Sequence, residues 1–395
     1  MSEHKAFSAT GNQMVTHAFR QVDPDVMAAY PITPQTTIVE GYAKLVANGK
    51  VHTEYVTVES EHSALSACIG ASAAGARVAT ATSSQGLALM WEELHVASGM
   101  RCPIVMANAN RALSAPINIH GDHSDIMGAR DTGWVMFFAE TAQEAYDNSV
   151  ISFKVAEDER VQLPVLTTLD GFVTTHAMER CEIEEDQTVK DFVGDHVTKY
   201  PLLDTDNPVG KGMFANLGPT YMKVKRVERD ALDNSLAVIE EHGKAWEKIT
   251  GRPFDLVDSW GTEDADTIVV VLGSVAGNAR YVARQLRAEG KKVGVVRPRV
   301  FRPFPAKQIA EACKGAKAVA VLDRSDSFGA QFAPLAVEVA AALFAEGVNI
   351  PLSNYITGLG GADVTLDLMY QVYNELDEIV AGTRKPGLSY LGIDE

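Results

Sequence analysis

Residues 53–82 place the tightest limit on what this chain can fold into. Two apolar extended runs, residues 53–58 and 77–82, flank a helical stretch made largely of Ala, Ser and Gly. Small side chains at helical spacing let another backbone approach closely, as in a buried helix crossing. A strand, a buried helix and a further strand in succession are the building unit of parallel sheets. The stretch therefore predicts an α/β fold whose sheet is covered on both faces.

The alternation of strands and helices continues on both sides of this stretch. Further strands are predicted at residues 26–30, 103–107, 133–138 and 165–169, with helices near 35–47, 87–98 and 141–155. The last of these helices opens with a capping box, Thr141-x-x-Glu144.

After residue 180 the pattern gives way to acidic and Pro-rich segments and a charged helix near 221–250, and the alternation resumes at about residue 266. We therefore predict a parallel-sheet domain over residues 1–180, a linker segment with an outer helix over 181–262, and a second, smaller α/β domain over 263–395.

Composition excludes several classes of function. The net charge of −17 and the pI near 5.0 argue against nucleic acid or an anionic membrane as a partner. The four cysteines are scattered without a C-x-x-C pair, so we expect neither a metal site nor an iron–sulfur cluster within this chain. No apolar run approaches membrane-spanning length, and the first ten residues are polar. We expect a cytoplasmic protein.

The carboxyl ends of the predicted strands carry most of the polar motifs, and in open parallel sheets ligands bind beyond these ends. The motifs are the proline-braced residues 31–34, a polar turn at 83–86, a long polar segment at 108–132, and Asp170-Gly171. Arg111 follows the end of its strand, and its planar guanidinium offers donors suited to a carboxylate. Thr33 could add a hydroxyl to the same anion. The alternative is a surface ion pair between Arg111 and Asp122 or Asp125.

Glu61 stands where an extended run turns into the small-residue helix. With Ser60 as N-cap, an acid in the first helical turn favours the helix dipole, and that structural role alone would explain it. A carboxylate at the start of a nearly apolar helix is also suited to carry a proton. Glu59, two residues earlier, is the second candidate for this role.

Other motifs give weaker signals. His120-x-x-His123, with acids nearby, permits a metal site, but no regular helix would bring the ligands together. Residues 273–278 follow a strand without completing G-x-G-x-x-G, so a dinucleotide site is not expected there. Residues 358–361, Gly-Leu-Gly-Gly, are most simply a turn that needs positive φ.

Taken together, nine motifs resemble the alpha subunits of the 2-oxoacid:ferredoxin oxidoreductases, and most closely those of the pyruvate:ferredoxin oxidoreductases (pyruvate synthases). In chain order they are YPITP (30–34), ESEHSA (59–64), GASAAGAR (70–77), SQGLALM (84–90), NRALSAP (110–116), DHSD (122–125), RDTGW (130–134), KVAED (154–158) and FRPFP (301–305). The resemblance covers nearly the whole chain. It implies a thiamine-diphosphate-binding domain of the transketolase pyrimidine type, followed by a transketolase C-terminal-like domain.

The resemblance also implies roles for single residues. Glu61 matches the acid that binds N1′ of the aminopyrimidine of thiamine diphosphate, and Glu59 then serves the structure. Pro31, Ser84 and Gln85 would line the cofactor site. Thr33 and Arg111 match the positions that hold the 2-oxoacid. The implied reaction converts pyruvate and coenzyme A reversibly to acetyl-CoA and CO2, with electrons passing to ferredoxin.

The chain lacks the G-D-G…Asn motif that holds Mg²⁺ and the diphosphate, and it lacks cluster cysteines. By resemblance, Mg²⁺ and the [4Fe-4S] clusters belong to beta, gamma and delta subunits, and thiamine diphosphate is shared with beta. Preference for a branched-chain 2-oxoacid or 2-oxoglutarate stays open, as do the physiological direction of the reaction and the subunit stoichiometry. A non-catalytic assembly protein of the same fold is the alternative from another class.

Overall fold

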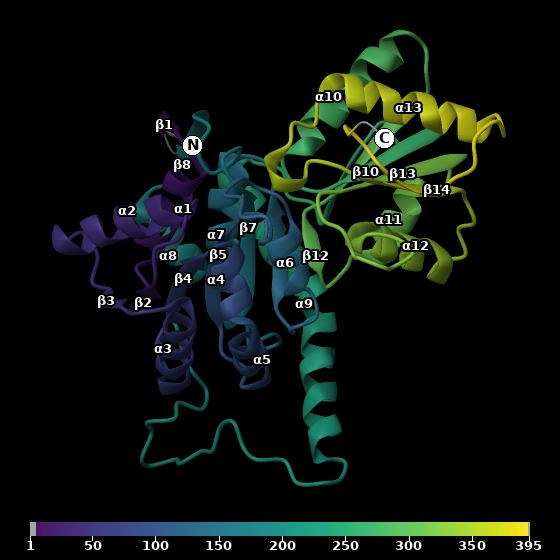
Figure 1. Ribbon diagram of the computed structural model, residues 1–395. Helices are drawn as coiled ribbons and strands as arrows, with labels where there is room; N and C mark the ends of the chain where they lie inside the picture. The colour runs from purple at the N-terminus through teal and green to yellow at the C-terminus, as the bar shows by residue number, and fades with distance from the viewer. Residues whose placement is uncertain (1–4, 394–395) are drawn as a thin grey trace.

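Two sheets, each covered by helices, make up the body of the protein (Figure 1). The computed structural model describes residues 5–393; the first four residues of the polar N-terminal stretch lie outside this range. Within it, no helix is long and apolar enough to cross a membrane. The predicted α/β class is confirmed.

The first sheet has seven strands, and all of them but one edge strand run parallel. In spatial order they are β12 (Val300–Arg302), β6 (Val135–Ala139), β7 (Val165–Asp170), β5 (Ile104–Asn110), β4 (Val78–Thr82), β2 (Val26–Ala29) and β3 (Glu54–Thr57). Every residue of β4 and β5 is buried. Burial on both faces is typical of a parallel sheet, and it includes the polar residues Thr80, Thr82, Asn108 and Asn110.

Helices cover both faces of this sheet. One face carries α1 (Gly11–Val22), α2 (Thr36–Ala47) and α7 (Ala142–Glu157), which share one apolar cluster. The other face carries α3 (Glu61–Ala74), α4 (Ser84–Leu89), α5 (Trp91–Gly99) and α6 (Ser124–Gly128), which share another. Helix α3 begins as predicted, because the Ser60 hydroxyl accepts from the Ser63 backbone N–H, and it ends at Gly75 in the left-handed conformation.

The second sheet has six strands. They are β15 (Leu388–Tyr390), β14 (Leu352–Ile356), β13 (Ala318–Asp323), β10 (Thr267–Val271), β11 (Val293–Pro298) and the antiparallel β9 (Val257–Trp260). Helices α10 (Val275–Ala288) and α13 (Leu366–Val380) cover one face, and α11 (Ala306–Cys313) and α12 (Pro334–Ala345) cover the other. The short η1 (Leu359–Gly361) follows β14. Gly358, Gly360 and Gly361 all have positive φ, as predicted.

The two sheets are joined by a strand and by a buried ionic cluster. β12 follows β11 directly but pairs with β6 of the first sheet, so Phe301 packs against Phe138. Arg297 and Arg299 reach back to Glu144 at the start of α7. Burial alone would raise the pKa of Glu144, but these arginines outweigh it and lower that pKa to about 2. The joint is therefore both apolar and ionic.

The segment between the sheets is only partly packed. β1 (Lys5–Ala9) pairs with β8 (Glu179–Ile183), and α8 (Asp186–Val193) packs on α1. The 31-residue α9 (Thr220–Thr250) buries its C-terminal half, where Trp246 donates to Asp147. Its N-terminal half projects downward in Figure 1, and the chain before it runs below the first domain.

Several local predictions were wrong. Residues 83–86 are not a polar turn, because α4 already begins at Ser84. The helix predicted over 87–98 is two helices that meet at Met90. The Thr141 hydroxyl does accept from Glu144 N–H, but the Glu144 carboxylate binds the backbone N–H of Glu140 instead of completing a capping box.

Candidate active site

Polar side chains gather at the carboxyl ends of β2, β4, β5 and β7. Strands β4, β5 and β7 are hydrogen-bonded neighbours, so the residues that follow them are close in space. Gly171 permits the close approach of two of these ends, since a Cβ on it would lie 2.1 Å from the carbonyl oxygen of Asn110. The site is thus assembled by sheet order.

Asp125, at the start of α6, is the buried acceptor that joins these ends. Its Oδ2 accepts from Ser84 N–H (2.9 Å), Arg111 N–H (3.1 Å) and the Asn108 amide (3.1 Å). Its Oδ1 accepts from the Asn110 amide (3.0 Å) and from the backbone N–H of Ile126 (2.7 Å). Burial raises the pKa of Asp125, and these donors oppose that rise. Asp125 thereby fixes the ends of β4 and β5 relative to each other.

The Arg111 side chain is buried without an acidic partner. Its Nε donates to the carbonyl of Asn118 (2.8 Å), and one terminal nitrogen donates to the carbonyl of Thr33 (3.1 Å). The ion pair considered for Arg111 with Asp122 or Asp125 is absent from the described residues, since Asp125 takes only the backbone N–H. A guanidinium has five N–H donors, so three lack a protein acceptor here. The structure places the Thr33 backbone carbonyl against Arg111, whereas the Thr33 hydroxyl, which the sequence suggested as a ligand, belongs to an exposed residue.

Glu61 is buried to 8% exposure at the first position of α3. Its carboxylate receives no hydrogen bond from residues 5–393. Its side chain lies against Gly86 of α4, where a Cβ would sit 2.9 Å from Oε1 and 2.6 Å from the Thr82 hydroxyl. Glu59 is exposed instead, and its carboxylate accepts from the Ser63 hydroxyl (2.5 Å). A buried carboxylate without a donor is suited to a ligand that brings one.

The first turn of α4 is held in an unusual conformation. Ser84 has φ of 50°, in the left-handed region that disfavours a side chain. The Asp125 carboxylate and the Ala112 carbonyl, which accepts from the Ser84 hydroxyl (2.7 Å), hold it there. Gln85 is half-buried, Pro31 is exposed, and the buried hydroxyls of Thr82 and Ser83 have no partner in the described chain.

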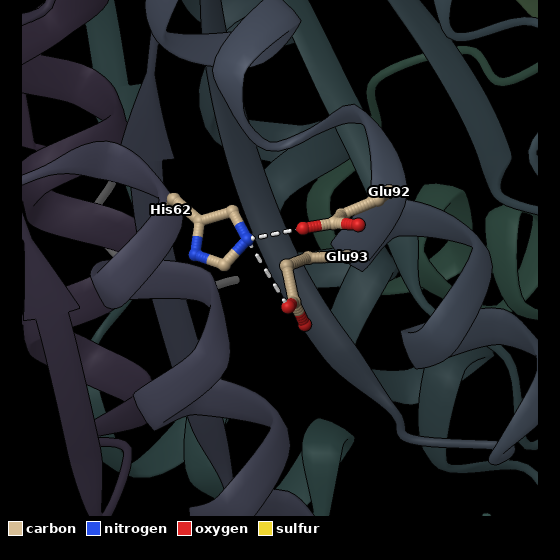
Figure 2. Close-up of side chains that lie close together, drawn as sticks. All are labelled: His62, Glu92 and Glu93. Atoms are coloured by element: carbon tan, nitrogen blue, oxygen red, sulfur yellow. Dashed lines mark hydrogen bonds and ion pairs between the residues drawn. The ribbon is translucent and has the colours of Figure 1, made fainter.

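A cluster of three polar side chains, His62, Glu92 and Glu93, lies beside Glu61 and nearer the surface. Figure 2 shows His62 pointing between Glu92 and Glu93, with its Nε2 at 2.8 Å and 3.4 Å from their carboxylates. The three ligand atoms lie within 4.8 Å of one another. Glu92 is largely exposed, and both acids stand in the first turn of α5, where the helix dipole favours negative charge. Hydrogen bonds to the imidazole and the helix dipole account for this group.

The metal site considered at His120 and His123 does not form. His120 is exposed, whereas the buried His123 places Nε2 2.7 Å from Asp170. Arg324 of the second domain lies 2.9 Å from the same carboxylate, and Ser274 donates to it as well. Burial would raise the pKa of Asp170, but Arg324 and His123 hold it below the usual range. Asp170 is thus committed to an ionic contact between the domains.

Sequence reasoning missed the contribution of the second domain to this site. Gly360 donates its N–H to Asp122 (2.9 Å), and its carbonyl accepts from Asn118 (2.9 Å). Asn118 is also an acceptor for Arg111, so the 358–361 turn supports the loop that positions the arginine. The glycine pattern predicted the turn but carried no signal for its partner.

A hollow of about 900 Å³ lies elsewhere, between α9 and α12. Charged side chains line it, but they are already paired, as in Arg302 with Glu338 and Lys225 with Glu228. The buried Glu61 and Arg111, which have no ionic partner among residues 5–393, lie at the strand ends, and these ends remain the candidate site.

Comparisons with protein families cover most of the chain. Residues 17–244 match the family described as pyruvate flavodoxin/ferredoxin oxidoreductase, thiamine-diphosphate-binding, and residues 265–369 match pyruvate:ferredoxin oxidoreductase core domain II. The chain is 47% identical to pyruvate synthase subunit PorA of Thermotoga maritima, over 98% of each chain. It is 44% identical to the PorA subunit of Methanocaldococcus jannaschii, over 93% of this chain and 94% of that one.

Another relative and two solved structures extend these findings. The ketoisovalerate oxidoreductase subunit VorA of Pyrococcus horikoshii is 40% identical, over 94% of this chain and 93% of that one. A 2-oxoglutarate:ferredoxin oxidoreductase of Magnetococcus marinus shares the fold, with a TM-score of 0.73 and 20% identity over 96% of this chain and 66% of that one. A split-gene transketolase aligns over 95% of this chain and 96% of that one, with a TM-score of 0.53 and 14% identity.

Proposed function

Because this chain belongs to the family of pyruvate flavodoxin/ferredoxin oxidoreductases, we propose that its strand-end site binds thiamine diphosphate and a 2-oxoacid. The chain is an alpha-type subunit of a 2-oxoacid:ferredoxin oxidoreductase, and the relatives named pyruvate synthase indicate pyruvate as substrate. The reaction is the reversible oxidative decarboxylation of pyruvate with coenzyme A to acetyl-CoA and CO2, with electrons passing to ferredoxin. The observation that carries the site is the pair of buried charges without an ionic partner in the described chain, Glu61 and Arg111.

Glu61 fits the aminopyrimidine end of the cofactor. Its carboxylate is buried and lacks a donor within the described range, while Gly86 leaves room beside it. Glu61 would accept from the protonated N1′, and Pro31, Ser84 and Gln85 would line the same site. When bound, thiamine diphosphate stabilises the carbanion that loss of CO2 from a 2-oxoacid leaves behind. The task of Glu61 is to hold the ring and share its proton.

Arg111 and Thr33 would bind the 2-oxoacid. The free N–H donors of Arg111 match the two oxygens of a carboxylate, and the Thr33 carbonyl fixes the guanidinium plane. Burial strengthens this contact because few waters compete for the donors. The arrangement would orient the substrate through its carboxylate.

The remaining parts of the reaction would lie on partner chains. We assign Mg²⁺, the diphosphate site and the [4Fe-4S] clusters to beta, gamma and delta subunits, since the motifs for them are missing from this sequence. Thiamine diphosphate would then be shared with beta. The four cysteines are free and buried, which supports a reducing, cytoplasmic location.

A branched-chain 2-oxoacid is the second candidate substrate. The observation in its favour is the 40% identity to the ketoisovalerate subunit, which is lower than the 47% to a pyruvate subunit. Ala112 and Ser114, on the loop beside Arg111, are small enough to accept either substrate.

The test uses the complex that copurifies with this chain. Viologen reduction with coenzyme A is compared for pyruvate, 2-oxoisovalerate and 2-oxoglutarate, and we expect pyruvate to give the highest kcat/KM. Arg111→Ala should lower kcat/KM about 30- to 1,000-fold, because a charge-assisted bidentate contact is lost. This change corresponds to a loss of roughly 2–4 kcal/mol of transition-state stabilisation. Arg111→Lys should recover only part of this. Unchanged kinetics in Arg111→Ala would remove that residue from the site.

A second assay addresses Glu61 without relying on turnover. Glu61→Gln should weaken binding of thiamine diphosphate in a titration while the complex stays assembled. Glu59→Gln is the matched control, since Glu59 is exposed and binds only Ser63. Equal cofactor affinity in the two variants would contradict the role of Glu61.

A further inference from the structure

The loop that carries Arg111 lies between the two domains. It follows β5 and ends at α6, and its middle, residues 114–117, is exposed. The second domain meets this loop where it returns to the first. Arg324, which follows β13, donates from its guanidinium to the Gly121 carbonyl (2.6 Å), and its own carbonyl accepts from the His123 N–H (2.7 Å). The second domain is therefore hydrogen-bonded directly to the loop.

Asn118 makes a further contact between this loop and the second domain. Its Nδ2 donates to the Gly360 carbonyl (2.9 Å), and the Gly360 N–H donates to Asp122 (2.9 Å). The Oδ1 of Asn118 accepts from the His120 N–H (2.7 Å). One end of this side chain must donate and the other must accept, which an amide can do and a carboxylate or an apolar group of the same size cannot. The contact therefore requires the asparagine side chain.

The approach of the second domain to this loop is close enough to require glycine. Gly360 has a φ of 59°, and a Cβ on it would lie 2.5 Å from Nδ2 of Asn118. A Cβ on Gly361 would lie 2.3 Å from the Cβ of His120. The two glycines thus serve the contact between the domains as well as the turn itself.

Asn118 also holds the guanidinium of Arg111. The Asn118 carbonyl accepts from Nε (2.8 Å), while the Thr33 carbonyl accepts from a terminal nitrogen (3.1 Å). Two acceptors on different nitrogens of a planar group fix its plane, and so fix the direction of the N–H donors left for a ligand. Thr33 belongs to the first domain, whereas the side chain of Asn118 is bound to Gly360 of the second. Displacement of Asn118 would therefore turn Arg111.

We propose that Asn118 is a positioning residue, through which the second domain sets the affinity of the site for the 2-oxoacid. This inference rests on the proposed function, in which Arg111 binds the carboxylate of that substrate. The Asn118 side chain anchors the loop to Gly360, and the Asn118 carbonyl orients the arginine. A donor that is already oriented loses less conformational entropy when it binds its ligand. The contact with the second domain should therefore act on KM more than on kcat.

The first experiment compares Asn118→Ala and Gly360→Ala in the assembled complex. Asn118→Ala removes the donor to Gly360 but keeps the carbonyl that binds Arg111. The matched control is Gly347→Ala, because Gly347 also has a positive φ (70°), is exposed, and has nothing within 4 Å of a Cβ.

Both test variants should show a rise of about 10-fold in KM for pyruvate and in the inhibition constant of oxamate, an unreactive amide that carries the same carboxylate. Their kcat and their affinity for thiamine diphosphate should change by less than about twofold, and the control should match the wild type. Asn118→Ala introduces no bulk, so it decides the result if Gly360→Ala fails to assemble.

A double-mutant cycle separates positioning from general support of the fold. In an Arg111→Ala background, Asn118→Ala should cause no further rise in KM, because the group through which it acts is gone. An equal rise in both backgrounds, or an unchanged KM in Asn118→Ala alone, would overturn the positioning role and leave Arg111 as the substrate ligand. An unchanged KM in Arg111→Ala alone would instead refute the proposed function, and this inference with it.

Discussion

Replacing Asp125 by Asn changes one atom at the centre of the candidate site. The side chain keeps its size, but one carboxylate oxygen becomes an NH2 group that donates where it used to accept. Oδ2 serves three donors and Oδ1 serves two. Whichever oxygen is replaced, at least two buried N–H groups lose their acceptor and face a further donor.

The expected cost follows from these contacts. Each buried donor left unsatisfied costs about 1–3 kcal/mol. Asn108 can recover part of this by rotating its amide, because its Oδ1 is buried without a partner and could accept from the new NH2. Relief of the buried charge recovers a further part. We therefore expect Asp125→Asn to lower the free energy of unfolding by about 2–4 kcal/mol.

Urea denaturation of the isolated chain, followed by tryptophan fluorescence, measures this value. Asp131→Asn is the matched control, because Asp131 lies in the same segment with a side chain 74% exposed, and its effect should stay below about 0.5 kcal/mol. In the complex, Asp125→Asn should also raise KM for the 2-oxoacid, since Asp125 holds the backbone of Arg111. A variant as stable as the wild type, with unchanged KM, would refute the role of Asp125 in joining the strand ends.

Two further predictions concern the joint between the sheets and the space beside Glu61. The pKa of Glu144 is lowered from 4.5 to about 2, so its ion pairs stabilise the fold above about pH 4.5 and are lost as the pH falls toward 2; the shift corresponds to about 3 kcal/mol. Unfolding measured between pH 7 and pH 3 should therefore show a shallower pH dependence in Glu144→Gln, and a slope equal to that of the wild type would contradict it. Gly86→Ala should weaken binding of thiamine diphosphate at least 10-fold, because its Cβ would displace Glu61, whereas Gly70→Ala, with nothing within 4 Å, should leave binding unchanged. Equal cofactor affinity in the two alanine variants would show that the space beside Glu61 is not needed.

Local patterns predicted much of the fold because strands and helix starts are encoded within a few residues. The strand predicted at 165–169 is β7, and the small-residue helix begins after Ser60 as predicted, since each combines an apolar run with a clear boundary. The side-chain partner of Glu144 could not be predicted, because Arg297 lies some 150 residues away and competes with the local cap.

In the candidate site, too, local features could be predicted from the sequence and long-range contacts could not. Sheet order places Thr33 near Arg111, which follows from the position of each residue at a strand end, but the contact uses the Thr33 backbone carbonyl and not the hydroxyl that the sequence suggested. The sequence could not decide whether an acid near Arg111 pairs with its side chain or its backbone, which depends on the path of the loop. His123 illustrates the same limit, since its ring binds Asp170 of the first domain and its backbone N–H donates to the Arg324 carbonyl of the second.

The position of β12 has a consequence for where this chain can be cut. Because the strand belongs by sequence to the second half but completes the sheet of the first, a fragment ending near residue 262 would leave β6 with an open edge. Unprotected edges pair with any extended chain that is available, so such a fragment should aggregate even though it retains its own apolar core. Fusion, permutation or division of this chain would succeed only at junctions that keep residues 300–302 beside β6.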